Sequence, residues 1–480
     1  MWQRFLFSMS RIISILLFCL FSFNSYESFS ASPYNDADDL TKEFHKGRRE
    51  ALRKLLPDSS VAVFFANPVR NRSNDIDFDY HQDPDFYYLT GLREPNSMLI
   101  LFKEEQDFDS IKTHEILFIQ GKNLFEEKWT GMRLSVDDAK FLLGFKVILL
   151  SKDFADFKLD FLKYKKIFNP KMFDDVRDDS NNRGDLYSLI KHFKNKTEYN
   201  KDHKNFRSFD LEQIMARLRE VKTEEELTLI RKAVKITCDA HLELMKALEP
   251  GMTEYQAQAI VEYYFKNEGS EYPAYPSIAG GGENSCILHY TANRKLLDNK
   301  DILVVDAGAE YQSYAADITR TLPVDGKFSQ EEKIIYNIVL DAQNAGIKAC
   351  KKGADFRAPH NAAVAVIQKR LLEHGIIKEA KEYNDYFFHG TSHYLGLDVH
   401  DAGLYGKLVP GNVITVEPGI YISAGSACDP KWWNIGVRIE DDVLITDGEP
   451  EVLSGSLPKK TEEIEVIMKQ QSMFDSLKKE

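Results

Sequence analysis

Residues 301–322 read DILVVDAGAEYQSYAADITRTL, and two strand-like runs around a short polar turn at 311–313 favour a β-hairpin. With the turn there, Asp306 and Asp317 are predicted to lie directly opposite each other and to project from one face of the hairpin. Asp306 follows four apolar residues, so two solvent-facing turn aspartates are the weaker alternative. Two carboxylates in one partly buried site raise each other's pKa unless a cation neutralises them.

Three histidines lie close together in the stretch HGTSHYLGLDVHD, residues 389–401. They are His389, His393 and His400, in a chain that has only 12 histidines. A lone histidine is more often structural than a ligand, but three with interspersed glycines suit a loop held close to a metal. The cluster therefore predicts a functional site.

Two further strand-like runs, VITVEPGIYI and GVRIEDDVLIT, each contain one glutamate, Glu417 and Glu440 respectively. Strand alternation places Arg438 on the same face as Glu440, which makes it a natural partner for that carboxylate. The adjacent Asp441 and Asp442 are expected to form a charge pair beside a turn. Taken alone, either glutamate fits a buried salt bridge as well as a metal ligand.

Together these segments supply four carboxylates and one imidazole, from Asp306, Asp317, His393, Glu417 and Glu440. Such a set is too negative to be buried without cations, and two divalent ions would balance the four carboxylate charges. Oxygen-rich ligation with a single nitrogen favours manganese, with cobalt, iron and zinc as alternatives. Two neighbouring ions that share a bridging water suit amide hydrolysis.

The size and charge of the chain narrow the class of protein. Its 480 residues favour two or three domains. With 75 acidic and 62 basic residues the formal net charge is -13, which argues against a nucleic-acid partner. The five cysteines are scattered without a CxxC pair, so neither a zinc ribbon nor a disulfide scaffold is indicated. We expect isolated, mostly buried thiols.

The N-terminus resembles a secretory signal peptide. Arg4 and Arg11 precede an apolar run at 12–23, which is short for a membrane span of roughly twenty residues. Small residues favour cleavage near Ser30. We expect export to the periplasm or the medium, without stable membrane insertion after cleavage. An uncleaved anchor, a lipidated Cys19 and a mitochondrial presequence are alternatives.

Hydrophobic periodicity divides the rest of the chain into two domains. A first, smaller α/β domain at 38–205 would follow the signal peptide at 1–30, and an α+β catalytic domain with a curved antiparallel sheet backed by helices would occupy 211–470. The first domain is expected to contain a helix at 39–56 and strands at 61–66, 98–102, 116–119 and 147–150. Expected helices in the second domain are 211–248, with a capped start at Thr223, then 254–267, 330–349 and 360–374. The segment 152–210 is charged and turn-rich, with a helix permitted at 186–193.

The chain resembles aminopeptidase P, in the proline-specific branch of the pita-bread metallopeptidases. The site segments above carry the resemblance, together with DFYYLTGLREPNSMLILF at 85–102 and GENSCILHYT at 282–291, all in the family's order. The resemblance implies a pita-bread catalytic domain after a smaller α/β N-terminal domain, and a homodimer or homotetramer. It also implies release of the N-terminal residue from peptides whose second residue is proline.

The resemblance assigns a role to each metal-site residue. Asp317 and Glu440 would bridge two metal ions. Asp306 would bind one ion, and His393 and Glu417 would bind the other. Glu417 would also relay the proton of the nucleophile, which makes it a catalytic residue as well as a ligand.

The resemblance also assigns residues to the substrate. His289 and His400 match histidines that stabilise the tetrahedral intermediate and the leaving proline nitrogen, which an imidazole can do without adding a fixed charge. Trp129 resembles a tryptophan that approaches a neighbouring subunit's active site, although a core tryptophan is an equal alternative. The candidate substrate-binding residues are His389, Tyr405 and Arg438.

Two other functions remain open at this point. A proline dipeptidase would share all five ligands but accept only dipeptides. A metal-free binding protein of the same fold would be expected to lack ligands, and all five are present here. The connection that carries Tyr405, between His400 and Glu417, is shorter than in typical bacterial relatives and lacks an arginine that they place near the substrate, so the preferred peptide length is also open.

Overall fold

The computed structural model describes residues 38–201 and 204–475. The predicted signal peptide at 1–30 lies outside these residues. Within the described part of the chain, no helix combines the length and apolarity that crossing a membrane requires. The described residues divide into two compact units. One includes Lys122–Arg133, and the other contains Leu40–Gly121 and the described residues from Leu134 onward. The short helix α4 (Glu127–Thr130) belongs to the first unit, and all other elements below belong to the second.

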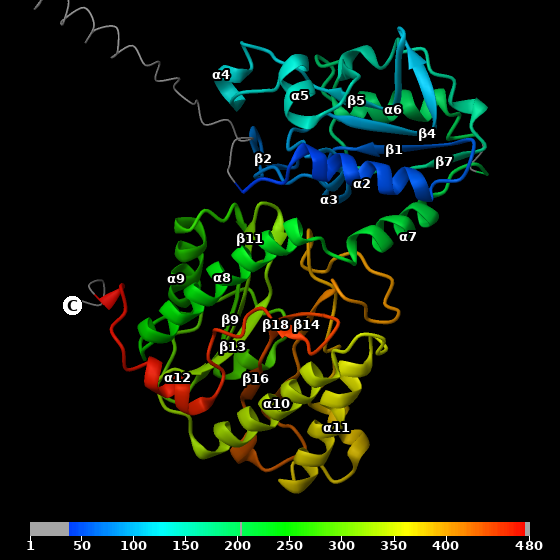
Figure 1. Cartoon of the computed structure of the whole chain (residues 1–480). Coiled ribbons are helices and arrows are strands. Elements are labelled where there is room, and N and C mark those ends of the chain that lie inside the picture. Colours follow the sequence, from blue (N-terminus) through cyan, green and yellow to red (C-terminus); the bar gives the residue numbers. More distant parts are fainter. Residues whose placement is uncertain (1–37, 202–203, 476–480) are drawn as a thin grey trace, which may run out of the picture. The chain divides into compact units, whose positions relative to one another are not determined.

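A five-stranded mixed sheet forms the N-terminal part of the larger unit (Figure 1). Its strand order is β6-β5-β4-β1-β7, and β1 pairs antiparallel with β4 and parallel with β7. All six residues of β1 are buried, which follows from its continuous apolar sequence SVAVFF. The predicted α/β character is confirmed. The strands of this sheet are β1 (Ser60–Phe65), β4 (Met98–Phe108), β5 (Ile111–Ile119), β6 (Ile148–Leu150) and β7 (Lys166–Phe168). A separate two-stranded sheet consists of β2 (Asn71–Ser73) and β3 (Ile76–Asp77).

Four helices accompany this sheet, of which the first in the chain corresponds to the expected helix at 39–56. They are α2 (Lys42–Leu55), α3 (Pro84–Thr90), α5 (Val136–Leu143) and α6 (Leu186–Lys196). The last of these confirms that the charged segment at 152–210 contains a helix. The same segment also contains β7, which its few apolar residues did not predict. Its Ile167 and Phe168 are nevertheless buried, and Ile167 belongs to the main hydrophobic core of this part.

The second half contains long helices whose starts follow local capping signals. At the start of α8 the Thr223 hydroxyl accepts from the Glu226 N–H, and the Glu226 carboxylate accepts from the Thr223 N–H. This confirms the predicted capping box and separates α8 from α7, so that the predicted helical stretch 211–248 is two helices. The helices are α7 (Ser208–Arg219), α8 (Glu224–Ala247), α9 (Glu254–Asn267), α10 (Gln330–Ala349), α11 (Ala358–Glu373) and α12 (Thr461–Ile467).

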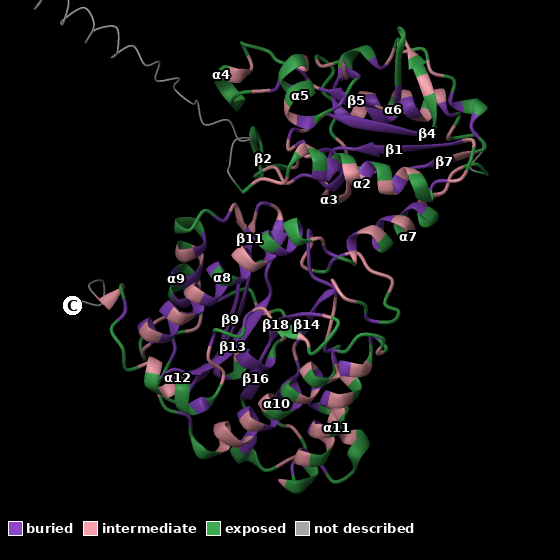
Figure 2. Cartoon of the chain, in the orientation of Figure 1, coloured by how far each residue is buried: buried purple, intermediate pink, exposed green. Residues whose placement is uncertain are grey.

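Antiparallel strands occupy the middle of this half, with α8 and α9 on one side and α10 and α11 on the other (Figure 1). Figure 2 shows these strands as largely buried. The strands are β8 (Tyr272–Pro273), β9 (Ile278–Gly281), β10 (Ile302–Ala307), β11 (Ala309–Tyr311), β12 (Tyr314–Ala315), β13 (Ile318–Pro323), β14 (Val413–Val416), β15 (Gly419–Ile422), β16 (Ile435–Arg438), β17 (Asp441–Leu444) and β18 (Glu451–Val452). Short 3₁₀ helices are η1 (Ser151–Asp153), η2 (Phe161–Lys163), η3 (Gly282–Cys286), η4 (Ala380–Asp385) and η5 (Pro430–Trp432). This is the predicted α+β arrangement of antiparallel sheet and helices.

The register of the 301–322 hairpin differs from the prediction. Asp306 lies opposite Thr319, not opposite Asp317. The pairing is displaced by two residues because Tyr311 pairs with Tyr314, which leaves Gln312 and Ser313 as the turn, both with positive φ. A shift of two residues keeps a side chain on the same face of a strand. The prediction that the two aspartates share one face therefore holds.

The prediction that Asp441 and Asp442 form a charge pair beside a turn is wrong. Both residues belong to β17 and are fully buried. The Arg320 guanidinium donates to Asp441 at 2.7 Å, and the Lys459 ammonium donates to the same carboxylate at 2.6 Å. Asp442 accepts the Asp317 N–H at 3.1 Å. Asp441 can be buried because two cations neutralise it.

Candidate active site

A cavity of about 640 Å³ brings together nine of the ten candidate site residues. They come from the 301–322 hairpin, the histidine loop and the two glutamate segments. Tyr405 lies elsewhere, in a neighbouring hollow beside Phe356. The nine candidates that line the cavity are His289, Asp306, Asp317, His389, His393, His400, Glu417, Arg438 and Glu440.

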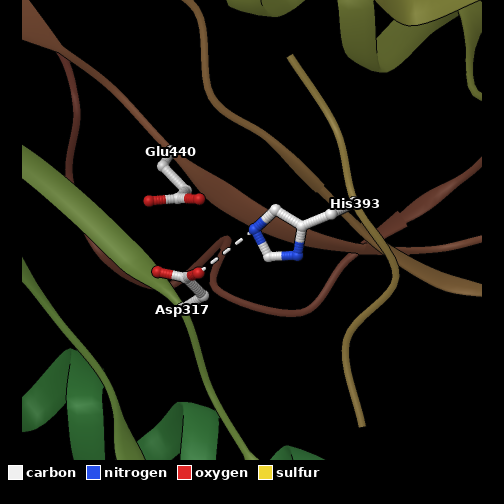
Figure 3. Close-up of side chains that lie close together, drawn as sticks. All are labelled: Asp317, His393 and Glu440. Carbon is white, nitrogen blue, oxygen red and sulfur yellow. Dashed lines mark ion pairs between the residues drawn. The ribbon is translucent and has the colours of Figure 1, made fainter. Parts of the chain in front are cut away.

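The centre of the cavity is formed by Asp317, His393 and Glu440. One ligand atom from each of the three lies within 4.8 Å of the other two, and Figure 3 shows their side chains pointing toward a common point. His393 Nε2 is 3.4 Å from Asp317 Oδ2 and 3.5 Å from Glu417 Oε1. A nitrogen and several carboxylate oxygens at this spacing form a ligand set suited to a divalent metal.

Backbone pairing between the histidine loop and β14 places His393 and Glu417 together. The Thr415 N–H donates to the His393 carbonyl at 3.0 Å, and the Glu417 N–H donates to the Thr391 carbonyl at 2.9 Å. The Thr415 hydroxyl lies 3.3 Å from Glu417 Oε1 and also accepts the His393 N–H. The glycine-containing loop is therefore held along β14, the strand that directly precedes Glu417.

Arg438 pairs with Asp306 and not with Glu440, which corrects the predicted partner. Its guanidinium donates to Asp306 Oδ2 at 2.6 Å. Glu440 instead accepts from the Thr319 hydroxyl at 2.6 Å. The Thr319 hydroxyl also lies 3.2 Å from Arg438 Nε. Thr319, which lies opposite Asp306 in the hairpin, therefore connects the hairpin to the segment that contains Arg438 and Glu440.

Tyr275 is a site residue that the sequence did not single out. Its hydroxyl is 2.6 Å from Asp306 Oδ1 and also hydrogen-bonds to Asp317. The residue lies in the short segment between β8 and β9. A single tyrosine between prolines has no periodicity or spacing that would mark it, so only the folded structure identifies it.

The electrostatics of the cavity fit positive ions. Burial, together with the charges of the neighbouring carboxylates, raises the pKa of Glu440 well above its ordinary value. Burial also raises the pKa of Asp306, and it raises the pKa of Glu417 to about 7. Burial alone would lower the pKa of His393, but the hydrogen bond to Asp317 and the charge of Glu417 raise it to about 9. The carboxylates therefore need added positive charge to stay ionised together, which is what bound divalent cations provide.

The other histidines surround this centre in less charged positions. Burial and the charge of Arg438 lower the pKa of His389 to about 3, so its imidazole is neutral. Its Nε2 is 2.9 Å from the Tyr421 hydroxyl. The His400 ring lies 4.3 Å from the His393 ring, measured between centroids, and burial with the His393 charge lowers the pKa of His400. His289 and His400 are both exposed on the cavity wall, where an imidazole can meet a substrate.

Two further predictions concern residues outside the cavity. Trp129 is 81 % exposed, so the alternative of a core tryptophan is wrong.

Among the described cysteines, Cys238, Cys286 and Cys350 are buried and Cys428 is partly exposed, and all four are free thiols. The expectation of isolated, mostly buried thiols is therefore confirmed for the described part of the chain.

The fold and this donor set define a metal-dependent peptidase with a pita-bread catalytic domain. The chain belongs to the aminopeptidase P group of metallopeptidase family M24. Residues 228–447 match metallopeptidase family M24, and residues 45–168 match the aminopeptidase P N-terminal domain.

Relatives of known sequence and structure agree with this membership. The chain is 35 % identical to Xaa-Pro aminopeptidase of Escherichia coli over 90 % of this chain and 98 % of that protein. It is 33 % identical to human Xaa-Pro aminopeptidase 3, over 88 % of this chain and 84 % of that protein. The structure of E. coli aminopeptidase P with the inhibitor Pro-Leu matches with a TM-score of 0.79 at 34 % identity, over 90 % of this chain and 98 % of that one. Pseudomonas aeruginosa aminopeptidase PepP matches with a TM-score of 0.81 at 33 % identity, over the same shares.

Proposed function

We propose that the protein is an Xaa-Pro aminopeptidase, which hydrolyses the bond between the first residue of a peptide and a proline in second position. The observation that carries this proposal is the convergence of four carboxylates and one imidazole in a cavity that His289 and His400 line. The family membership supports it, because several relatives are themselves named Xaa-Pro aminopeptidases.

The donor set supports two divalent ions, with manganese favoured because four of the five ligands are carboxylates. In this assignment Asp317 and Glu440 would be ligands of both ions, Asp306 would be a ligand of one, and His393 and Glu417 would be ligands of the other. When bound, such a pair supplies Lewis-acid activation of the carbonyl and a lowered pKa for the attacking water.

The chain's own residues supply proton transfer and recognition. Glu417 is positioned by Thr415 and can accept the proton of the attacking water. A proline amide is tertiary, lacks an N–H and has a fixed φ near about -65°, so recognition through that N–H is not available. In this proposal His289 and His400 donate to the developing oxyanion and to the departing ring nitrogen instead, which their positions on the cavity wall support.

A side-by-side assay of X-Pro, X-Pro-Y and X-Ala-Y peptides with manganese tests this function. We expect release of the first residue from X-Pro-Y and much poorer cleavage of X-Ala-Y. Cleavage confined to X-Pro would instead establish the proline dipeptidase. Absence of cleavage with every divalent metal would favour a metal-free binding protein.

We further propose that the signal peptide at 1–30 directs export and is removed near Ser30. The mature enzyme would have two domains, at 38–205 and 211–470, and would form a homodimer or homotetramer. The charged start and short apolar run support export. N-terminal sequencing of the protein from its own cells should find a start near Ala31. An intact Met1 in the cytosolic fraction would contradict export.

A further inference from the structure

A second hollow of about 560 Å³ adjoins the cavity that contains the candidate ligands. Three residues, His389, Gly390 and Ser392, line both spaces, so a ligand can extend from one into the other. The remaining lining residues of the second hollow are Phe356, Arg357, His360, Tyr383, Asn384, Phe387, Phe388, Thr391 and Tyr405. They come from the start of α11, the segment that follows it and the loop that contains Tyr405.

The charge in this hollow is positive and not neutralised. Arg357, at the N-terminal end of α11, is exposed, and its guanidinium has no ion pair or hydrogen bond with any described residue. The carboxylate nearest in sequence, Asp355, is paired with Lys407 at 2.8 Å. No acidic residue lines the hollow. Burial and the Arg357 charge together lower the pKa of His360, which shows that the guanidinium acts on the lining of this space.

The walls beside this charge are largely aromatic. Phe388 is 55 % exposed and Tyr405 is 54 % exposed, so both rings offer apolar surface to a ligand in the hollow. Tyr405 packs edge-on against Phe356, which fixes one wall. The hollow therefore combines apolar faces with one free cation, and such a space suits a peptide segment that has an apolar side chain and a carboxylate.

The size of the hollow decides which part of a substrate it can hold. An aminopeptidase substrate has only one residue before the scissile bond. A single side chain is much smaller than 560 Å³, a volume in the range that drug-sized ligands fill. The residues after the proline are therefore the better occupant.

We propose that this hollow binds the part of the substrate that follows the proline, and that Arg357 is a specificity-determining residue that binds a carboxylate there. The proposal rests on the proposed aminopeptidase function. The carboxylate can be the C-terminus of a tripeptide or an acidic side chain, because a guanidinium binds both in the same way.

Three peptides separate these sources of the carboxylate: X-Pro-Phe as the free acid, X-Pro-Phe amide and X-Pro-Asp amide. For the wild type we expect kcat/KM to be about tenfold higher for each peptide with a carboxylate than for X-Pro-Phe amide. In Arg357→Ala and Arg357→Gln both ratios should fall close to one, and Arg357→Lys should retain part of the preference. Lys369→Ala is the matched control, since it removes an exposed cation from the same helix outside the hollow, and it should keep the wild-type ratios.

A change in only one of the two ratios would assign Arg357 to that carboxylate source alone and would support the site in that narrower form. Wild-type ratios in both Arg357→Ala and Arg357→Gln would overturn the proposal. Failure of the wild type to cleave any X-Pro peptide would overturn the proposed function instead, so the two failures are distinguishable.

Discussion

Asp306 has an arginine partner, whereas the other three candidate carboxylate ligands have no ion pair with lysine or arginine among the described residues. Arg438 supplies that partner. Asp317 and Glu417 lie close to the single imidazole of His393 instead, and Glu440 accepts from a threonine hydroxyl. Since one arginine and one imidazolium cannot balance four carboxylates, added cations are needed for all four to be ionised.

His400 lies next to the cluster of candidate ligands but is not one of the residues whose ligand atoms converge. Its loss should therefore lower turnover and leave the metal content unchanged. In His400→Ala we expect kcat for X-Pro-Y to fall by roughly a hundredfold or more, as for loss of a proton-transfer group. Steady-state kinetics and elemental analysis of the same preparation measure both quantities. His192→Ala, a partly exposed histidine on α6, is the control. Wild-type kcat in His400→Ala, or loss of metal, would contradict the assigned role.

Among the helices and strands, features that depend on neighbouring residues in the sequence could be predicted more accurately than features that depend on distant residues. The bounds of α9 and α10 agree with the expected 254–267 and 330–349 because caps and apolar spacing are encoded within each helix. The hairpin register is displaced from its prediction by two residues because it depends on which residues form the turn. The burial of Asp441 depends on Arg320, which lies far away in the sequence, and no local pattern reveals such a partner.

The same limit applies to the site. All five metal-ligand candidates could be chosen from the sequence, because each is a polar residue in an otherwise apolar or glycine-rich segment. The partner of Arg438 and the role of Tyr275 could not be predicted, because both depend on how separate strands meet.

The ion pair between Arg320 of β13 and Asp441 of β17 gives a prediction at this scale. Both side chains are fully buried. Asp441→Asn should destabilise the fold by roughly 3–5 kcal/mol, because it leaves a buried arginine without its charge partner. Asp447→Asn breaks an exposed pair with Lys352 and should cost at most about 1 kcal/mol. Denaturant unfolding of both variants and the wild type measures these free energies. Equal stability of Asp441→Asn and Asp447→Asn would contradict the role of the buried ion pair.

At the scale of the whole molecule, the free energy of unfolding should depend on pH through buried histidines. His45 is buried, with Nδ1 3.0 Å from the Tyr88 carbonyl, and burial lowers its pKa to about 3. Its folded pKa is below the unfolded value of about 6.5, so the unfolded chain binds the extra proton between these values. Stability is then lost as the pH falls from about 6.5 toward 3.

The size of this effect can be isolated by comparison with His45→Gln, which does not titrate. From pH 7.5 to pH 5 the wild type should lose about 2 kcal/mol relative to that variant, because the loss approaches about 1.4 kcal/mol for each pH unit below the unfolded pKa. Urea unfolding of both proteins at pH 7.5 and pH 5 measures the difference. If wild type and His45→Gln differ in the free energy of unfolding by the same amount at both pH values, the folded protein protonates His45 as easily as the unfolded chain does. That result would contradict the lowered pKa.

Metal titration of the metal-depleted protein, with an X-Pro-Y peptide as substrate, shows whether hydrolysis depends on divalent ions held by the five candidate ligands. The account predicts no hydrolysis without divalent metal, recovery with manganese as two ions bind per chain, and no recovery in Asp317→Ala or Glu440→Ala, each of which should retain fewer ions. Full hydrolysis of the peptide after removal of all divalent metal, or two retained ions with ordinary turnover in either variant, would contradict it.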